Sequence, residues 1–224
     1  MSGTTLNGVT ETALRLQVLR QLAHWEGAAE RLDDFEASAS PAAWNSLERY
    51  LGLTLRGELK EACEQLRREA ASIRASYNAA RTQDALERIS DALSALRESY
   101  LQTELLVDYY ADAVRSRANP ELGAQLRACD IMAERAPAGG REKLGRRAPP
   151  VMTYFKPGIG AAILRIGTPL WDGSLSRVAA IKLTYHNRLR PTALIHEIGH
   201  QVAALRLERF ARASAPGQAL RGRQ

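Results

Sequence analysis

Residues 178–205 of the chain read VAAIKLTYHNRLRPTALIHEIGHQVAAL. The run from Val178 to Tyr185 is mostly apolar and partly β-branched, which predicts a strand. Pro191 suits the first position of a helix, where the N–H that proline lacks has no partner within the helix. The apolar residues that follow predict a largely buried helix: Ala193, Leu194, Ile195, Ile198, Val202, Ala203 and Leu205. We therefore expect a strand that leads directly into a buried helix.

Two histidines lie one turn apart on this expected helix. His196 and His200 are four residues apart, so they project from one face with about 6 Å between them. At that spacing both imidazoles can reach one zinc ion at about 2.0–2.1 Å. Glu197 lies about 100° around the helix from His196, within reach of a water on that ion. The three residues form an H-E-x-x-H motif of two zinc ligands and a general base, and the structural alternative is a pair of histidines on a buried helix.

From Pro191 to Leu205 the sequence resembles the zincin-type zinc metallopeptidases. The resemblance implies a hydrolase with a Zn²⁺ cofactor that cleaves a peptide or protein substrate. It implies that His196 and His200 bind the metal and that Glu197 is catalytic. A small sheet that leads into the active-site helix is also expected from the resemblance, in agreement with the strand at 178–185.

A third zinc ligand is harder to find in the sequence. Catalytic zinc sites have three protein ligands and one position open to water. Only 24 residues follow His200, and Glu208 is the only acid among them. Glu208 could share the ion only if the helix broke near Ala204. Upstream, His186 is an equal candidate third ligand, and Asp172 is a further one. The short C-terminal remainder favours a metallopeptidase domain that is C-terminally incomplete.

The first 136 residues show helical periodicity and no strand-like alternation. Ser40-Pro41 and Asn119-Pro120 each predict an N-cap followed by the first residue of a helix. The stripe that continues from Leu59 to Tyr77 and from Leu86 to Tyr100 resembles heptads. It predicts a helical hairpin with a turn near 78–83, or a single long helix.

Together these patterns predict an α+β protein in which an N-terminal all-α bundle or hairpin precedes a small zincin-like sheet and the active-site helix. We expect a helical domain at 1–136, a linker rich in Pro, Gly and Arg at 137–150, and a metallopeptidase domain at 151–224. Val151–Phe155 and Ala161–Ile166 read as two strands of a hairpin that turns at Pro157–Gly160.

Composition narrows the class of protein. Of the 224 residues, 45% are hydrophobic and 25% charged, as in ordinary soluble globular proteins. No apolar run is long enough for a membrane span, and no secretory signal is visible, which favours the cytoplasm. Cys63 and Cys129 are isolated and read as reduced thiols. Residues 141–223 carry fifteen Lys and Arg against four acids, but no nucleic-acid-binding module is apparent, so nucleic acid is disfavoured as a partner.

Two functions remain open at this point. The first is a zinc-dependent metallopeptidase in which the strand at 178–185, as an exposed sheet edge, holds an extended substrate, with Tyr185 or His186 against the oxyanion. The second is a non-catalytic helical interaction module that carries a degenerate metallopeptidase remnant. In that case the N-terminal helices serve self-association or bind a protein partner.

Overall fold

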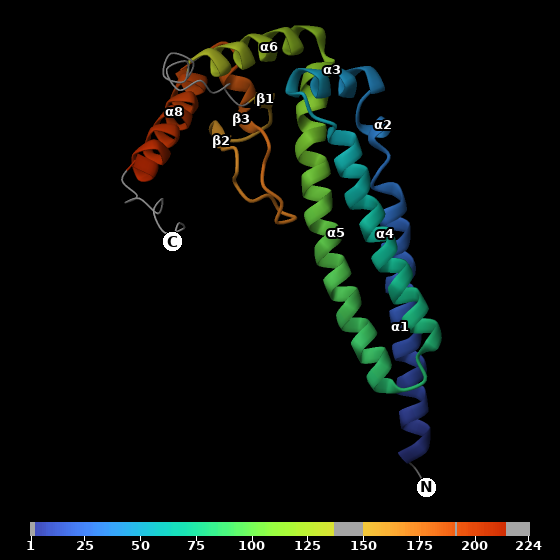
Figure 1. Cartoon of the computed structure of the whole chain (residues 1–224). Coiled ribbons are helices and arrows are strands. Elements are labelled where there is room, and N and C mark those ends of the chain that lie inside the picture. The colour runs from blue at the N-terminus through green and yellow to red at the C-terminus, as the bar shows by residue number, and fades with distance from the viewer. Residues whose placement is uncertain (1–2, 137–149, 191, 214–224) are drawn as a thin grey trace, which may run out of the picture. The chain divides into compact units, whose positions relative to one another are not determined.

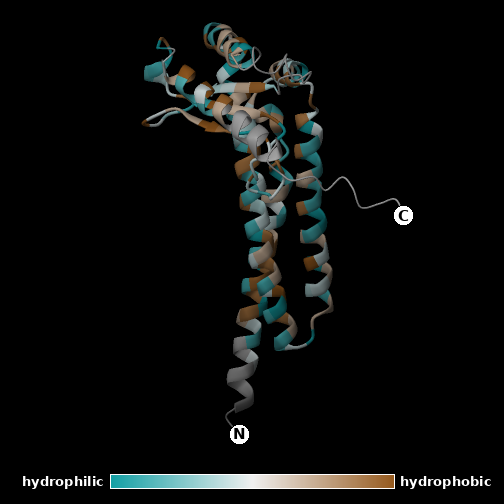
Figure 2. Ribbon diagram, turned by 60° about the vertical axis from the view of Figure 1, so that its left-hand side comes forward, coloured by the Kyte–Doolittle hydropathy of each residue, from teal (hydrophilic) through white to brown (hydrophobic). Residues whose placement is uncertain are grey.

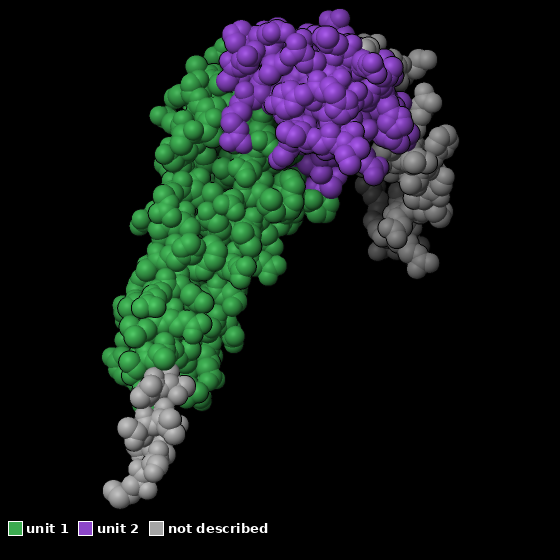
Figure 3. Space-filling view, turned by 180° about the vertical axis from the view of Figure 1, so that it is seen from behind, with its two compact units in different colours: residues 1–114, 169–174 green, residues 115–168, 175–224 purple. Residues whose placement is uncertain are grey.

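The computed structural model describes residues 3–136, 150–190 and 192–213. It is an α+β structure in which helices predominate over a single three-stranded sheet, as expected. Its residues form two compact units, one of residues 1–114 and 169–174 and the other of residues 115–168 and 175–224 (Figures 1 and 3). Among the described helices, none is both long and apolar enough to cross a membrane.

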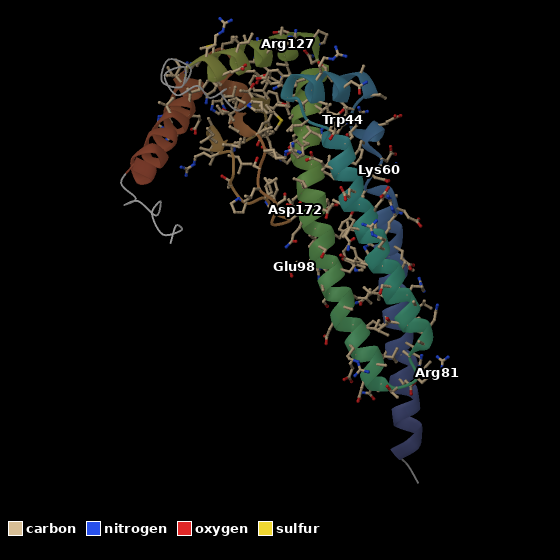
Figure 4. The ribbon with its side chains drawn as sticks, viewed as in Figure 1. Trp44, Lys60, Arg81, Glu98, Arg127 and Asp172 are labelled. Carbon is tan, nitrogen blue, oxygen red and sulfur yellow. The ribbon has the colours of Figure 1, made fainter. Side chains whose placement is uncertain are left out.

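The first unit is built from helices α1 (Gly3–Arg31), α2 (Phe35–Ser38), α3 (Pro41–Leu51), α4 (Leu55–Ala79) and most of α5 (Gln83–Ala118). The Ser40 side chain accepts a hydrogen bond from the Ala43 amide and Pro41 opens α3, so the expected cap is confirmed. Helix α3 ends at Gly52, whose φ of 67° is the left-handed conformation that glycine adopts without a steric penalty. Trp44 of α3, labelled in Figure 4, is fully buried.

Helices α4 and α5 are two separate helices, which confirms the hairpin and removes the single-helix alternative. The Thr82 hydroxyl accepts a hydrogen bond from the Ala85 amide, 3.3 Å away, at the start of α5. Helix α1 completes a three-helix core with the hairpin. Hydrophobic residues, coloured brown on the ribbon of Figure 2, recur along these helices. The buried core comprises Val18, Leu22, Ala29, Leu66, Ala70, Ala80, Leu86, Ile89, Leu93 and Leu96.

The second unit contains helix α6 (Pro120–Arg135), strands β1 (Val151–Phe155), β2 (Ala162–Leu164) and β3 (Ala179–Leu183), the 3₁₀ turn η2 (Tyr185–Asn187) and helix α8 (Thr192–Ala213). Asn119 accepts hydrogen bonds from the amides of Glu121 and Leu122, so this cap is confirmed too. Gly123 permits the tight passage from α5 to α6, because a Cβ there would lie 2.6 Å from the Arg117 carbonyl oxygen.

The order of strands in the sheet is β1-β3-β2, with β3 parallel to β1 and antiparallel to β2. The expected hairpin between the first two strands is therefore wrong. Strand β3 is buried along almost its whole length, whereas β2 is short and partly exposed. The short, partly exposed strand β2 forms one edge of the sheet, and the buried strand β1 forms the other.

The outer edge of β1 is closed by side chains rather than by another strand. Asp130 Oδ1 accepts a hydrogen bond from the Thr153 amide (2.8 Å), and Arg117 donates to the Thr153 carbonyl (2.7 Å). Ser116 Oγ lies 3.2 Å from the Phe155 amide and 3.1 Å from its carbonyl oxygen. Arg117 and Asp130 also form a bidentate ion pair, at 2.7 and 3.1 Å. Helices α5 and α6 thus satisfy the backbone groups that a further strand would have paired.

Helix α6 belongs with the sheet. Leu126 and Ala133 of α6 are buried in the same core as Val151, Phe155 and Ile181. The two units accordingly divide between residues 114 and 115, earlier in the chain than the boundary expected after residue 136. The linker expected at 137–150 lies outside the described residues except for Pro150.

We expect Asp130→Ala to reduce the free energy of unfolding of the second unit by about 3–5 kcal/mol, because it leaves the guanidinium of Arg117 buried without its counter-charge. The Asp130 side chain is 1% exposed and that of Arg117 is 11% exposed. Glu121→Ala is the matched control on the same helix, since its ion pair with Arg188 is 68% and 38% exposed and contributes about 0–1 kcal/mol. Urea unfolding followed by circular dichroism measures both; equal losses would contradict the buried pair's role.

Both cysteines are free thiols, and Cys63 is fully buried in α4. Burial raises the pKa of the Cys63 thiol to about 11, with a smaller contribution from the nearby Asp33 carboxylate. The reactive thiolate is therefore scarce below that pH. We expect Cys63 in a Cys129→Ser variant to react with a disulfide reagent at pH 8 only after denaturation. Rapid modification of the native protein would show that the bundle opens readily at this position.

Candidate metal centre

Helix α8 packs one face on the sheet and exposes the opposite face. Leu194 and Ile198 are buried in the core that the helix shares with β1 and β3, and Val202 is partly buried against it. Ile195 is 54% exposed, and Gly199, His196 and His200 are exposed as well. Over residues 192–200 and 202–203, whose side chains are described, the helix is thus half-buried rather than largely buried as expected, because a sheet of three strands covers only one side of it. Pro191, the expected first residue, lies outside the described residues.

His196 and His200 meet on the exposed face. Their Nε2 atoms are 3.1 Å apart, and the two rings are nearly perpendicular with centroids 4.6 Å apart. Two nitrogens bound tetrahedrally to one zinc at about 2.0–2.1 Å are about 3.3 Å apart. The pair therefore holds two donor atoms close to the separation that a single zinc ion requires. When both rings are neutral, the same geometry allows one imidazole to donate a hydrogen bond to the other.

Glu197 lies at the border between the buried and exposed faces. Its side chain is 8% exposed, in contrast to the two exposed histidines on either side of it. Among the described residues, no hydrogen bond or ion pair engages its carboxylate. Its carboxylate oxygens are therefore left with acceptor capacity for a water or another ligand.

His186 does not join the pair. It lies in the exposed turn η2, where its Nε2 is 3.3 Å from the Thr184 hydroxyl. Within the described part of the chain, no group of three or more His, Cys, Asp or Glu side chains is arranged to hold a metal. The fold brings His196 and His200 together, as predicted for the site, but His186 does not lie with them.

Glu208 lies on the same helix as the histidines, and its side chain is outside the described residues. The break near Ala204 that Glu208 would need in order to share the ion does not occur, because α8 continues without Gly or Pro from Gln201 to Ala213. Glu208 is eight residues beyond His200. A helix rises about 1.5 Å per residue, so these two positions are separated by about 12 Å along its axis. In this helical state Glu208 does not complete the site, and Asp172, which belongs to the first unit, is not grouped with it either.

The exposed face around the histidines is open. A Cβ added at Gly199 would meet no atom within 4 Å. Tyr185 precedes this helix and stacks on Phe155 with ring centroids 5.5 Å apart, so packing accounts for one face of its ring. Tyr185 as a whole is 47% exposed.

The strand expected to bind a substrate is not a sheet edge. Strand β3 pairs with β1 on one side and with β2 on the other, which contradicts the expectation. The outer edge of β1 is occupied by Asp130, Arg117 and Ser116. Strand β2 is the other edge strand of this sheet, and α8 contacts both β2 and β3.

Sequence reasoning missed the ion pair of Arg117 and Asp130. Both are charged residues within segments whose periodicity predicts only a helix. Of the two, only Asp130 is in line with the buried stripe of its helix. The signal was present in the spacing, since Asp130 lies four residues after Leu126 and therefore on the buried side of α6.

Comparison with protein-family models, with curated proteins and with solved structures finds no match to this chain. The candidate centre therefore depends on its own geometry and on the motif that forms it.

Proposed function

We propose that the chain is a zinc-dependent metallopeptidase whose metal is held by His196 and His200 and whose general base is Glu197. The single observation that carries the proposal is the 3.1 Å separation of the two Nε2 atoms beside Glu197, whose carboxylate has no partner among the described residues. The donor set fits zinc, for which imidazole nitrogens at tetrahedral separation are common ligands.

A bound zinc ion supplies a Lewis acid that polarises a carbonyl and makes a water acidic near neutral pH. Glu197 accepts the proton of the attacking water and delivers it to the leaving amine. His196 and His200 fix the position of the reaction relative to Glu197, because all three are held on one rigid turn of α8. Burial of Leu194 and Ile198 against the sheet sets the rotation of that turn.

Strand β2 is a sheet edge, which supports a peptide or protein as the substrate. An extended peptide can add to a sheet edge through backbone hydrogen bonds, which makes few demands on its sequence. Residues 162–164 provide this edge next to α8, and Gly199 leaves room for a backbone on the helix itself. We propose β2, in place of the central β3, as the strand that aligns the substrate.

The described residues supply two zinc ligands, and this favours a second candidate function. A two-histidine site binds zinc weakly, so the chain would then be a non-catalytic helical interaction module with an incomplete metal site. Zinc content and peptidase activity separate the two candidates.

We expect the purified protein to retain about one zinc ion per chain after dialysis, since a catalytic site has three protein ligands. His196→Ala and His200→Ala remove a ligand and should each abolish retention, whereas Glu197→Gln and the control Glu134→Gln should retain the metal. Atomic absorption measures the stoichiometry. Substoichiometric zinc in the unaltered protein would contradict the peptidase proposal and would favour the non-catalytic interaction module.

The third ligand is found by the same measurement on Glu208→Gln and His186→Asn. Loss of zinc in the first requires that α8 rearranges beyond Ala204 when metal binds. Loss in the second requires that the η2 turn moves toward α8. Either loss supports a complete site within the chain.

With zinc bound, Glu197→Gln should lower kcat/KM for an unstructured peptide by about 10²–10⁴, because the amide cannot accept the proton of water. Glu134→Gln makes the same charge change on α6 and should leave kcat/KM unaltered. Cleavage of a fluorescence-quenched peptide library, with and without a chelator, provides the assay. Cleavage that persists in Glu197→Gln would exclude Glu197 as the base.

A further inference from the structure

A hollow of about 330 Å³ lies on the first unit between α1 and α5, and none of its lining residues belongs to the candidate metal centre. Arg20, Gln21, His24 and Trp25 line it from α1, and Leu93, Ser94 and Arg97 line it from α5. Glu98, which directly follows Arg97 and is labelled in Figure 4, helps to locate this part of α5, although it does not line the hollow.

The floor of the hollow is apolar and well fixed. Leu93 is 2% exposed and belongs to the core of the three helices. Trp25 is half-buried, and its ring contacts Tyr100 with centroids 5.3 Å apart and His24 with centroids 4.8 Å apart. An indole and a leucine at the base of a groove between two helices form a seat for an apolar side chain.

The charged side chains that line the hollow are both basic. Arg20 and Arg97 are exposed, and no hydrogen bond or ion pair engages either of them among the described residues. By contrast, Arg15, Arg67 and Arg74 of the same unit pair with Glu11, Asp33 and Glu26. No carboxylate lines the hollow, so two guanidinium groups face it without a counter-charge.

We propose that the hollow is the docking site of an acidic amphipathic helix of a partner protein. A groove between two helices accommodates a third helix through an apolar anchor at its base, which here is the seat on Trp25 and Leu93. Carboxylates on the partner helix, one turn to either side of the anchor, then pair bidentately with Arg20 and Arg97. This interaction is independent of the proposed peptidase activity, because no residue is shared between the two sites.

The test uses the full chain and two synthetic helical peptides that share the same leucine stripe. One peptide has glutamates along the face beside the stripe, and the other has lysines at the same positions. Fluorescence anisotropy of each labelled peptide gives its Kd. We expect the glutamate peptide to bind, with a Kd that weakens as salt is added, and the lysine peptide not to bind.

The decisive variant is Arg20→Glu combined with Arg97→Glu, which reverses both charges at exposed positions. It should weaken the Kd for the glutamate peptide at least about tenfold, because like charges then face each other. Arg49→Glu combined with Arg88→Glu is the matched control, since both arginines are exposed, lie in the same unit and do not line the hollow. The control should bind as the unaltered chain does.

Three results would overturn the proposal. The first is no binding of the glutamate peptide to the unaltered chain, and the second is equal weakening in the two double variants. The third is a concentration-dependent dimer in sedimentation that only the Arg20→Glu, Arg97→Glu variant loses. That third result would assign the hollow to a second copy of this chain.

Discussion

The second unit depends on the buried carboxylate of Asp130, which is removed from water and hydrogen-bonded to Arg117 and Thr153. Asp130 is 1% exposed and receives hydrogen bonds from Arg117 and from the Thr153 amide, and the Thr153 hydroxyl lies 2.6 Å from it. A buried ion pair costs desolvation energy, and this cost is offset only when the remaining donors and acceptors are satisfied. Here the oxygens of the Asp130 carboxylate are satisfied by Arg117 and by Thr153 at the edge of a strand, so the pair fixes β1 against the end of α5 and against α6.

The position of the candidate centre follows from that attachment. Strand β1 is the template on which β3 pairs, and β2 pairs with β3 in turn. Helix α8 then buries Leu194 and Ile198 on this sheet. Because a helix has one residue every 100°, burial of these positions turns His196 and His200 outward and leaves Glu197 at the border. The chemistry proposed for this turn therefore rests on a sheet of only three strands.

The first unit illustrates a different use of charge. Some of its ion pairs join neighbouring helices: Arg74 of α4 pairs with Glu26 of α1, and Arg56 of α4 pairs with Glu48 of α3. The side chains of these pairs are 15–31% exposed to water, so the apolar stripes supply most of the stability and the pairs contribute specificity of helix pairing. Arg20 and Arg97 have no such partner among the described residues, and they border an apolar floor.

Local sequence determined much of the secondary structure. The caps at Ser40 and Asn119 act through the nearest backbone amides, so a few residues suffice to place the starts of α3 and α6. The separation of α4 from α5 was ambiguous because no Gly or Pro lies between Asn78 and Gln83, although Thr82 carries the capping signal. The meeting of His196 with His200 was also predictable, because the spacing of four is a property of the helix itself.

Tertiary structure decided what local patterns cannot encode. The hairpin between β1 and β2 looked favourable because the two segments are adjacent in sequence, yet β3, which follows both in the chain, lies between them and pairs with each. Helix α6 was assigned to the bundle by its periodicity, and its partners in the core are residues of the sheet. Periodicity shows that a face is apolar, but it does not show which distant element will cover that face. For the same reason the sequence determined the motif of the candidate centre, whereas the exposure of its histidines depended on how much of α8 the sheet covers.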